Sequence, residues 1–307
     1  MNVRIFEVGP RDGLQNESRT VALQTKLHWI QGLISAGLRD LEVGAFVRGD
    51  RVQQMADSEK VFQAWKSGAI RTGKATGWAL VPNLTGLEHA VAAGVRAIGV
   101  FTAASDGFNE RNIGMSIEDS LDEIQKIVKE ARRHKLKVRG YISTVFGCPF
   151  DGKVAPKQAL KVAEKLFDLG VPEISLADTI GVADPGLVKR VLQPALKSWG
   201  AKRLAVHFHD TRGTALANTL RSLDLGIRIV DSSAGGLGGC PFAPGATGNL
   251  ATEDLVYMLN GMGVKTGVNL DRLAEVNLEF CRMIQRPLSS RYLQAFASSS
   301  LNHRNGA

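Results

Sequence analysis

The sequence has few cysteines and no long apolar run, and both absences narrow the class of protein. Its 307 residues include only three cysteines, Cys148, Cys240 and Cys281. An odd number of cysteines in a chain of this length argues against a disulfide framework and favours a reduced, cytoplasmic protein. No stretch of about 18 consecutive apolar residues occurs, so we expect no transmembrane helix. The first residues do not resemble a signal peptide.

The sequence also lacks the charge patterns that are typical of nucleic-acid binding. The formal net charge is +8, but lysine and arginine are spread along predicted helices, without Arg-Gly repeats or a basic tail with interleaved aromatic residues. We therefore expect a solvated basic surface and no nucleic-acid or membrane partner. The alternative is a polyanionic small substrate, because positive potential raises its encounter rate.

Short β-rich segments alternate with longer helical patterns along the chain. The predicted strands are residues 3–8, 40–43, 76–81, 97–101, 137–145, 173–177, 203–208 and 227–231. The predicted helices are residues 22–36, 53–67, 84–93, 117–134, 156–169, 185–198, 214–225 and 252–261. Several of these helices end at glycine, as helix C-termini commonly do.

An uninterrupted series of βα units predicts an α/β fold, a (β/α)₈ TIM barrel with a C-terminal helical extension. A doubly wound nucleotide-binding sheet is the alternative, but the turn at residues 9–13 lacks its G-x-G-x-x-G spacing. We expect a catalytic domain over residues 1–265 with a lid loop at 233–249. Residues 266–307 should form the helical extension and a polar tail.

His207 and His209 close the seventh predicted strand and predict a metal site. Residues i and i+2 of a strand point to the same face, so two imidazoles lie side by side. Asp12 follows the first strand, and the carboxyl ends of barrel strands converge. One carboxylate and two imidazoles suit Mg²⁺, Mn²⁺ or Zn²⁺. The alternative is a histidine pair on an edge strand without a ligand.

Other polar residues lie at or near the same strand ends. They are Glu7, Arg11, Gln15, Glu42, Arg139, Tyr141 and Asp178. Ion pairs inside the barrel are the alternative role for Glu7 and Glu42, and an internal salt bridge is the alternative for Arg139. Cys240 lies in a glycine-rich loop that can bend over a ligand, which favours a mobile lid thiol over a core thiol. Cys148 and Cys281 fit ordinary small apolar positions.

Several of these segments resemble the 3-hydroxy-3-methylglutaryl-CoA lyases. The matching segments are EVGPRDGLQNE at residues 7–17, SIEDS at 116–120, YIS at 141–143, GCP at 147–149, LAVHFHDT at 204–211, and residues 231–254 with their glycine loop. The resemblance covers residue 3 to about residue 290. The loop that ends in Cys240-Pro241 separates these lyases from related Claisen-type synthases, and Leu14 and Asp210 also take the lyase form.

The resemblance implies metal-dependent cleavage of 3-hydroxy-3-methylglutaryl-CoA to acetyl-CoA and acetoacetate, as in leucine degradation and ketone body formation. It implies a divalent metal, Mg²⁺ or Mn²⁺, and a homodimer or higher homo-oligomer. The implied metal ligands are Asp12, His207, His209 and Asn249. The implied catalytic residues are Arg11, Cys240, Glu42 and Asp178, and the implied acyl-CoA substrate-binding residues are Arg11, Gln15, Arg139 and Tyr141.

The chain departs from the family pattern after the second strand. Ala45 stands where a hydroxylated residue is common, residues 48–55 differ from the usual Ser-Pro-Lys-x-Val-Pro-Gln-Met, and Arg212 replaces a residue that is often aromatic. These departures concern the substrate's acyl branch. They leave a different 3-hydroxy-3-alkylglutaryl-CoA as an alternative substrate. A related acetyl-CoA-dependent condensing synthase is an alternative function, against which the Cys240 loop argues. A non-enzymatic basic binding protein is another, against which the set of Asp12, His207, His209 and Asn249 argues.

Overall fold

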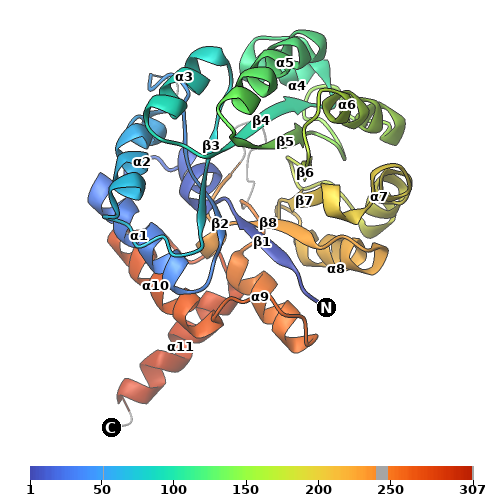
Figure 1. The fold of residues 1–307 in the computed structure, drawn as a ribbon. Helices are drawn as coiled ribbons and strands as arrows, with labels where there is room; N and C mark the ends of the chain where they lie inside the picture. Colours follow the sequence, from blue (N-terminus) through green and yellow to red (C-terminus); the bar gives the residue numbers. More distant parts are fainter. Residues whose placement is uncertain (51, 240–247, 306–307) are drawn as a thin grey trace.

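Eight parallel strands close into a barrel in chain order in the computed structural model (Figure 1). The structure describes residues 1–50, 52–239 and 248–305. The strands are β1 (Arg4–Glu7), β2 (Asp40–Ala45), β3 (Thr76–Leu80), β4 (Ala97–Ala103), β5 (Lys137–Ser143), β6 (Ile174–Asp178), β7 (Leu204–Phe208) and β8 (Ile229–Ser232). Each overlaps a strand predicted from the sequence, which confirms the TIM barrel.

Helices follow the strands and surround the barrel (Figure 1). The helices are α1 (Leu23–Ser35), α2 (Ser58–Ser67), α3 (Leu84–Ala92), α4 (Asp106–Ile113), α5 (Ile117–Arg133), α6 (Pro156–Asp168), α7 (Pro185–Trp199), α8 (Ala215–Leu225), α9 (Thr252–Gly261), α10 (Leu270–Met283) and α11 (Arg291–Asn305). Short helical turns are η1 (Gly9–Gly13), η2 (Gln53–Met55), η3 (Ala201–Arg203) and η4 (Ala234–Gly236). None of the helices in the described part of the chain is long and apolar enough to cross a membrane.

One predicted helix, over residues 53–67, is wrong as a single element, because η2 and α2 are separate there. The reason lies in Gln54, whose backbone carbonyl accepts the Nζ of Lys26 at 2.5 Å. The Gln54 side chain accepts the Val21 amide and donates to the carbonyls of Glu17 and Arg19. Tertiary hydrogen bonds therefore take the groups that a continuous helix would use.

The sequence patterns also missed α4, whose eight residues, DGFNERNI, lack an amphipathic repeat. Contacts with other segments hold this helix in place. Asp151 accepts the Gly107 amide at 2.9 Å, and the Asn109 side chain donates to the carbonyls of Met115 and Ser116. Tertiary context thus overrides a weak local propensity.

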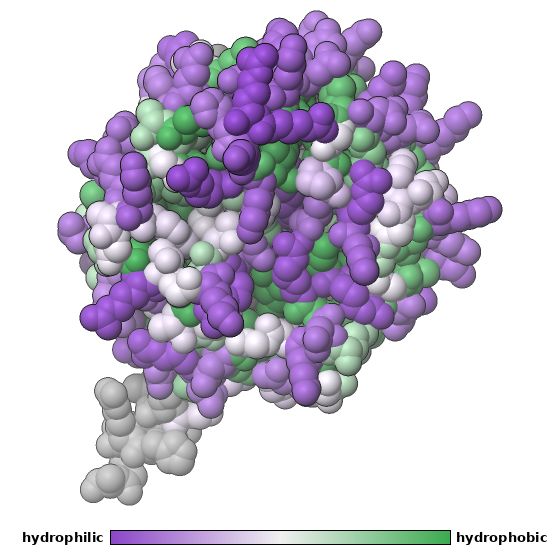
Figure 2. Space-filling model, viewed as in Figure 1, coloured by the Kyte–Doolittle hydropathy of each residue, from purple (hydrophilic) through white to green (hydrophobic). Residues whose placement is uncertain are grey.

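The C-terminal helices pack on the outside of the barrel and then leave it. The Trp29 ring on α1 stacks on Phe280 of α10 with ring centroids 3.8 Å apart, and its Nε1 donates to Asn277. On α11, the buried Leu293 packs with Leu278 of α10. Figure 1 shows α11 projecting away from the barrel towards the C-terminus. Hydrophilic residues dominate the molecular face seen in Figure 2.

Candidate metal-binding active site

The chain after β1 makes a single π-helical turn, η1, which places Arg11 and Asp12 at the carboxyl end of the barrel. The Val8 carbonyl accepts the amides of Arg11, Asp12 and Gly13 at 3.1, 2.7 and 3.2 Å. Single π-turns of this kind are frequent at functional sites. The turn therefore aims two charged side chains at the end of the barrel where TIM-barrel active sites form.

Asp12, His207 and His209 meet at this end of the barrel, as the sequence predicted. One potential ligand atom from each residue lies within 4.8 Å of the others. His207 Nε2 is 4.0 Å from Asp12 Oδ2, and both histidines are buried. The strand that carries the first histidine, β7, pairs with β6 on one side and β8 on the other. The histidines therefore do not lie on an edge strand, and that part of the alternative is wrong.

The electrostatics of this cluster suit a cation. Burial and the neighbouring His207 lower the pKa of His209 to about 4, so its imidazole is neutral near pH 7. Its Nδ1 is buried and has no hydrogen-bond partner among the described residues. Burial alone would raise the pKa of Asp12, but Arg11 and the two histidines lower it below its ordinary value. A neutral imidazole and a carboxylate are the forms that bind a metal.

Asn249 adds a fourth group with a free oxygen. Its Nδ2 donates to Asp12 Oδ2 at 2.9 Å and to the Leu237 carbonyl at 3.1 Å. Its Oδ1 is buried and has no hydrogen-bond partner within the described residues. Two backbone hydrogen bonds hold residues 248–250 beside the end of β7. Asp210 N donates to the Gly248 carbonyl, and Leu250 N donates to the Phe208 carbonyl. With its amide protons used, Asn249 can offer its carbonyl oxygen to a hard cation.

Asp231, which sequence reasoning did not place in the site, lies behind His207. Its Oδ2 is 3.4 Å from His207 Nδ1, and it also accepts the Ser175 hydroxyl at 2.8 Å. Arg139 donates to both Asp231 oxygens at 2.5 and 3.1 Å. Burial alone would raise the pKa of Asp231, but Arg139 and His207 lower it to about 2. A carboxylate behind a ligating histidine fixes the orientation of its ring. The sequence signal for this role of Asp231 was limited to an acidic residue at the end of a predicted barrel strand.

Arg11 is held on two sides by carboxylates. Its Nε donates to Glu42 Oε2 at 2.6 Å, and its Nη1 donates to Asp12 Oδ1 at 2.8 Å. Tyr141 donates its hydroxyl to the other Glu42 oxygen at 3.0 Å, and Gln15 donates to Asp12 at 2.8 Å. Glu42 is therefore ion-paired with Arg11 inside the barrel, which is the alternative role that the sequence offered for this residue. Five residues predicted for the site form one connected network.

Asp178 and Arg139 make their hydrogen bonds outside the network around Arg11. The carboxylate of Asp178 accepts the amides of Val182 and Ala183 at 2.9 and 3.0 Å, which shapes the loop after β6. Arg139 is fully buried, and it bonds Glu173 in addition to Asp231. Arg139 therefore forms the internal salt bridges that were the alternative interpretation of this residue. Cys240, predicted as the lid thiol, lies outside the described residues.

Two buried acids, Glu7 and Glu253, bond the backbone at η4, where the glycine loop begins. Glu7 accepts the Ala234 amide at 2.8 Å and the Thr252 hydroxyl at 2.7 Å. Both carboxylate oxygens of Glu253 accept the Gly235 amide at 3.0 Å. Burial raises the pKa of Glu7 to about 7 and that of Glu253 to about 8. The ion pair proposed for Glu7 is not formed with any residue that the structure describes.

Comparison with known proteins identifies one family. The family model described as HMGL-like matches residues 2–278. The mitochondrial hydroxymethylglutaryl-CoA lyase of Homo sapiens is 47% identical over 293 residues, covering 95% of this chain and 89% of that protein. The cytoplasmic 3-hydroxy-3-methylglutaryl-CoA lyase of Homo sapiens is 46% identical over 293 residues, covering 95% and 78%.

Solved structures give the same result. The crystal structure of hydroxymethylglutaryl-CoA lyase from Pseudomonas aeruginosa matches with a TM-score of 0.93 and 45% identity, over 97% of this chain and 98% of that one. The structure of an HMG-CoA lyase from Acenitobacter baumannii in complex with coenzyme A and 3-methylmalate matches with a TM-score of 0.91 and 36% identity, over 96% and 95%.

Proposed function

The chain belongs to the HMGL-like family, and from this membership we propose its reaction and the roles of its residues. The protein is a carbon–carbon lyase that cleaves 3-hydroxy-3-methylglutaryl-CoA to acetyl-CoA and acetoacetate. The observation that carries this function is the cluster of Asp12, His207 and His209 directly beside the fixed Arg11. The reaction needs a proton removed from the C3 hydroxyl, stabilisation of an acetyl-CoA enolate, and a proton for the enolate carbon.

The four groups at the strand ends fit a divalent cation, with Asp12, His207, His209 and Asn249 as its ligands. Two buried acceptor atoms, His209 Nδ1 and Asn249 Oδ1, lack a hydrogen-bond partner in the described chain and support this role. The bound cation supplies positive charge that lowers the pKa of the substrate's C3 hydroxyl and orients the substrate. The oxygen and imidazole ligands suit Mg²⁺ or Mn²⁺.

Arg11 is the residue best placed to stabilise the enolate oxygen. Arg11 is 7% exposed, and its guanidinium is oriented by Glu42 and Asp12 before substrate arrives. A preorganised donor of this kind needs no rearrangement during the reaction and typically contributes about 3–4 kcal/mol. Burial alone would lower the pKa of Arg11, but Glu42 and Asp12 raise it above its ordinary value, so the cation persists.

The remaining residues have supporting roles in this proposal. Gln15 orients Asp12, and Tyr141 orients Glu42, and we assign both to acyl-CoA binding. Arg139 acts through Asp231 on His207, and Asp178 shapes the loop after β6. Cys240, on the lid loop of residues 233–249, protonates the enolate carbon as lid closure excludes water.

The broader setting completes the proposal. Residues 1–265 act as the catalytic domain, and residues 266–307 extend it. The protein is cytoplasmic, forms a homodimer or higher homo-oligomer, and serves leucine degradation or ketone body formation. Relatives named as cytoplasmic occur beside relatives named as mitochondrial. Ala45 is buried at the carboxyl end of β2, at a position where a hydroxylated residue is common in the family, so the identity of the acyl branch is tested directly.

The decisive assay is acetyl-CoA release from a panel of 3-hydroxy-3-alkylglutaryl-CoA thioesters, with Mg²⁺ and with Mn²⁺. We expect the 3-methyl compound to be cleaved fastest and chelation to abolish turnover. If a longer 3-alkyl compound were cleaved fastest, the assignment of the methyl branch would be wrong. Release from none of the thioesters, together with acetyl-CoA-dependent condensation, would favour the synthase.

A further inference from the structure

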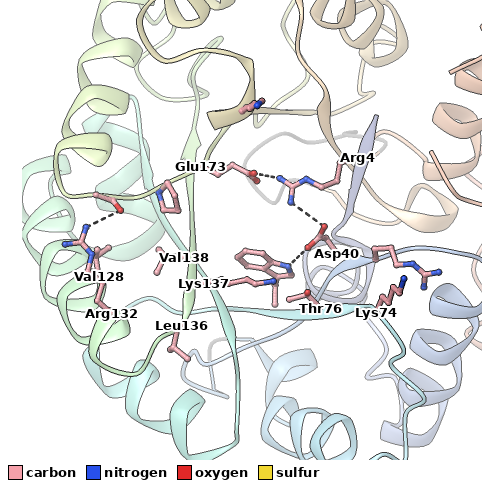
Figure 3. Close-up of a pocket in the computed structure, with 15 residues that line it drawn as sticks. Arg4, Asp40, Lys74, Thr76, Val128, Arg132, Leu136, Lys137, Val138 and Glu173 are labelled. Atoms are coloured by element: carbon pink, nitrogen blue, oxygen red, sulfur yellow. Dashed lines mark hydrogen bonds and ion pairs between the residues drawn. The ribbon is translucent and has the colours of Figure 1, made fainter. Parts of the chain in front are cut away.

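A cavity lies at the opposite end of the barrel from the metal ligands. Its volume is about 600 Å³, within the range of about 300–1,000 Å³ for small-molecule sites. Its walls come from the amino-terminal ends of several barrel strands, from the end of α5 and from η3. Figure 3 shows this cavity with Arg4, Asp40 and Glu173 among its labelled residues. The proposed lyase reaction does not use it.

The cavity has a strong excess of positive charge. Its cationic residues are Arg4, Arg39, Lys74, Arg132, Lys137 and Lys202, against the acids Asp40 and Glu173. Both acids are already paired. Arg4 bonds Asp40 at 3.4 Å and also bonds Glu173, and the two acids further accept Trp78 Nε1 and Arg139 Nε, both at 2.9 Å.

Four of the cations that line the cavity are exposed and have no side-chain partner among the described residues. The side chains of Arg39, Lys74, Lys137 and Lys202 make no hydrogen bond or ion pair with another residue in the described part of the chain. They come from four separate segments, so they surround the cavity instead of lining one solvated helix face. Like charges around a concave site focus positive potential into it and attract an anion.

The walls between these charges are partly apolar. They include Val128, Leu136, Val138 and Pro172. The buried ring of Trp78 also lines the cavity. A lone phosphate would need neither this volume nor these surfaces. A ligand that combines several negative charges with a ring or chain would use both.

We propose that this cavity binds an organic polyphosphate, the chemistry of a nucleoside di- or triphosphate. The phosphates would lie among Arg39, Lys74, Lys137 and Lys202, and the organic part would lie against the apolar walls. A free nucleotide and the nucleotide part of a CoA thioester share this chemistry. Titrations with ATP and with CoA separate the two sources, because CoA that occupied this cavity would bind twice per chain, once here and once at the active site.

The test uses two variants with the same charge change. Lys74→Glu/Lys137→Glu/Lys202→Glu reverses three cavity charges. Its control, Lys157→Glu/Lys161→Glu/Lys189→Glu, reverses three exposed lysines on α6 and α7 that do not line the cavity. Neither variant touches Arg4, Asp40 or Glu173, whose network reaches Arg139. Both should therefore fold and retain basal lyase activity, which is measured alongside circular dichroism.

Calorimetric titration with ATP, pyrophosphate and CoA at physiological salt gives the result. The intact protein should bind ATP at one site per chain and more tightly than pyrophosphate. The cavity variant should bind ATP at least about ten-fold more weakly, since each reversed charge removes one favourable contact and adds a repulsive one. The control variant should bind within about two-fold of the intact protein.

Three outcomes would overturn the proposal. The intact protein could bind none of the three probes at millimolar concentration. Both lysine variants could lose affinity equally, which would mean a general charge effect and no site. A single-stranded RNA could compete with ATP and depend on the same three lysines more strongly than ATP does, which would assign this face to nucleic acid. A matched Lys→Ala triple variant repeats the test without introducing acids.

Discussion

At the scale of single residues, the site is defined by which polar atoms are already paired. Asn249 uses both amide protons, yet its Oδ1 has no partner in the described chain. His209 Nδ1 is also buried and has no hydrogen-bond partner in the described chain. A buried polar atom without a hydrogen bond costs about 1–3 kcal/mol. These two costs are relieved if both atoms coordinate a cation, which is why we assign them as ligands.

Removing either ligand should weaken the metal without unfolding the protein. We expect Asn249→Ala to lower the affinity for Mn²⁺ and His209→Ala to lower it further, because an imidazole contributes more to a divalent site than an amide carbonyl. Titration calorimetry of metal-free protein measures both. Asn83→Ala is the control, since the Asn83 side chain caps α3 by accepting the Gly86 amide and bonds none of the four proposed ligands. It should cost only about 1 kcal/mol of stability. Unchanged metal affinity in both His207→Ala and His209→Ala would refute the ligand assignment.

Substituting Arg11 should affect the transition state more than substrate binding. Arg11→Lys keeps the charge but loses the planar fork that bonds Glu42 and Asp12 together. We expect kcat to fall about 10²–10³-fold with little change in KM. Arg111→Lys, a substitution on the exposed surface of α4, is the matched control. A normal kcat with a raised KM in Arg11→Lys would mean that Arg11 only binds substrate.

At the scale of secondary-structure elements, the sequence predicted the strands well because each is a short buried run ended by a glycine or polar signal. The pair His207 and His209 could be predicted for the same reason, since both residues lie at the carboxyl end of β7, His209 one residue beyond it. Asp231 was not readable as a site residue. Its role depends on Arg139, which is 92 positions away in the chain, and no local pattern carries such a contact. The predicted helix over residues 53–67 was wrong for the same reason, because Gln54 makes tertiary hydrogen bonds that no local pattern shows.

The two ends of the glycine loop also meet through a tertiary contact, and it explains one glycine. Gly238 has φ +127°, and a Cβ there would lie 2.5 Å from Asn249 Nδ2. Gly238→Ala should therefore displace Asn249, weaken metal binding and lower turnover. Gly226 has a similar φ of +114° but open space around a Cβ, so Gly226→Ala should cost about 1–3 kcal/mol of stability and leave the metal affinity unchanged.

The comparison of these two alanine variants isolates the steric contact from backbone strain. Metal affinity by calorimetry and the urea midpoint of unfolding are the two measurements. Equal effects of both variants on metal affinity would show that strain alone matters, and that Gly238 has no specific role in placing Asn249.

At the scale of the whole molecule, buried charges connect the two ends of the barrel. Glu173, at the amino-terminal cavity, bonds Arg139, which bonds Asp231, which faces His207 at the metal site. Glu7 and Glu253 form a second buried group that joins β1, η4 and α9. The first group contains its own counter-ion. The second contains no cation among its described hydrogen-bond partners, so ionising these two acids would leave negative charge buried without a counter-ion.

Stability should fall as the pH rises through the range in which Glu7 and Glu253 ionise. Burial raises their pKa values to about 7 and about 8, above the unfolded value of about 4.3. A carboxyl group with a raised folded pKa binds its proton more tightly in the folded state. The stabilisation by each protonated carboxyl group is complete below about pH 4. It is lost as the pH rises from about 4 to the folded pKa of about 7 or 8, with a slope of up to about 1.4 kcal/mol per pH unit for each proton.

Glu7→Gln should remove part of this slope, because an amide resembles the protonated acid. Its oxygen can accept the amides of Gly9 and Ala234, and its NH₂ can donate to the Thr252 hydroxyl. The measurement is urea unfolding of metal-free protein between pH 5 and pH 8.5, with the exposed Glu88→Gln as control. We expect Glu7→Gln to gain stability relative to the parent at high pH and Glu88→Gln to follow the parent. If Glu7→Gln and Glu253→Gln both kept the parent slope, the two acids would have to be ionised throughout, and the root of the loop would need a cation that sits beside them.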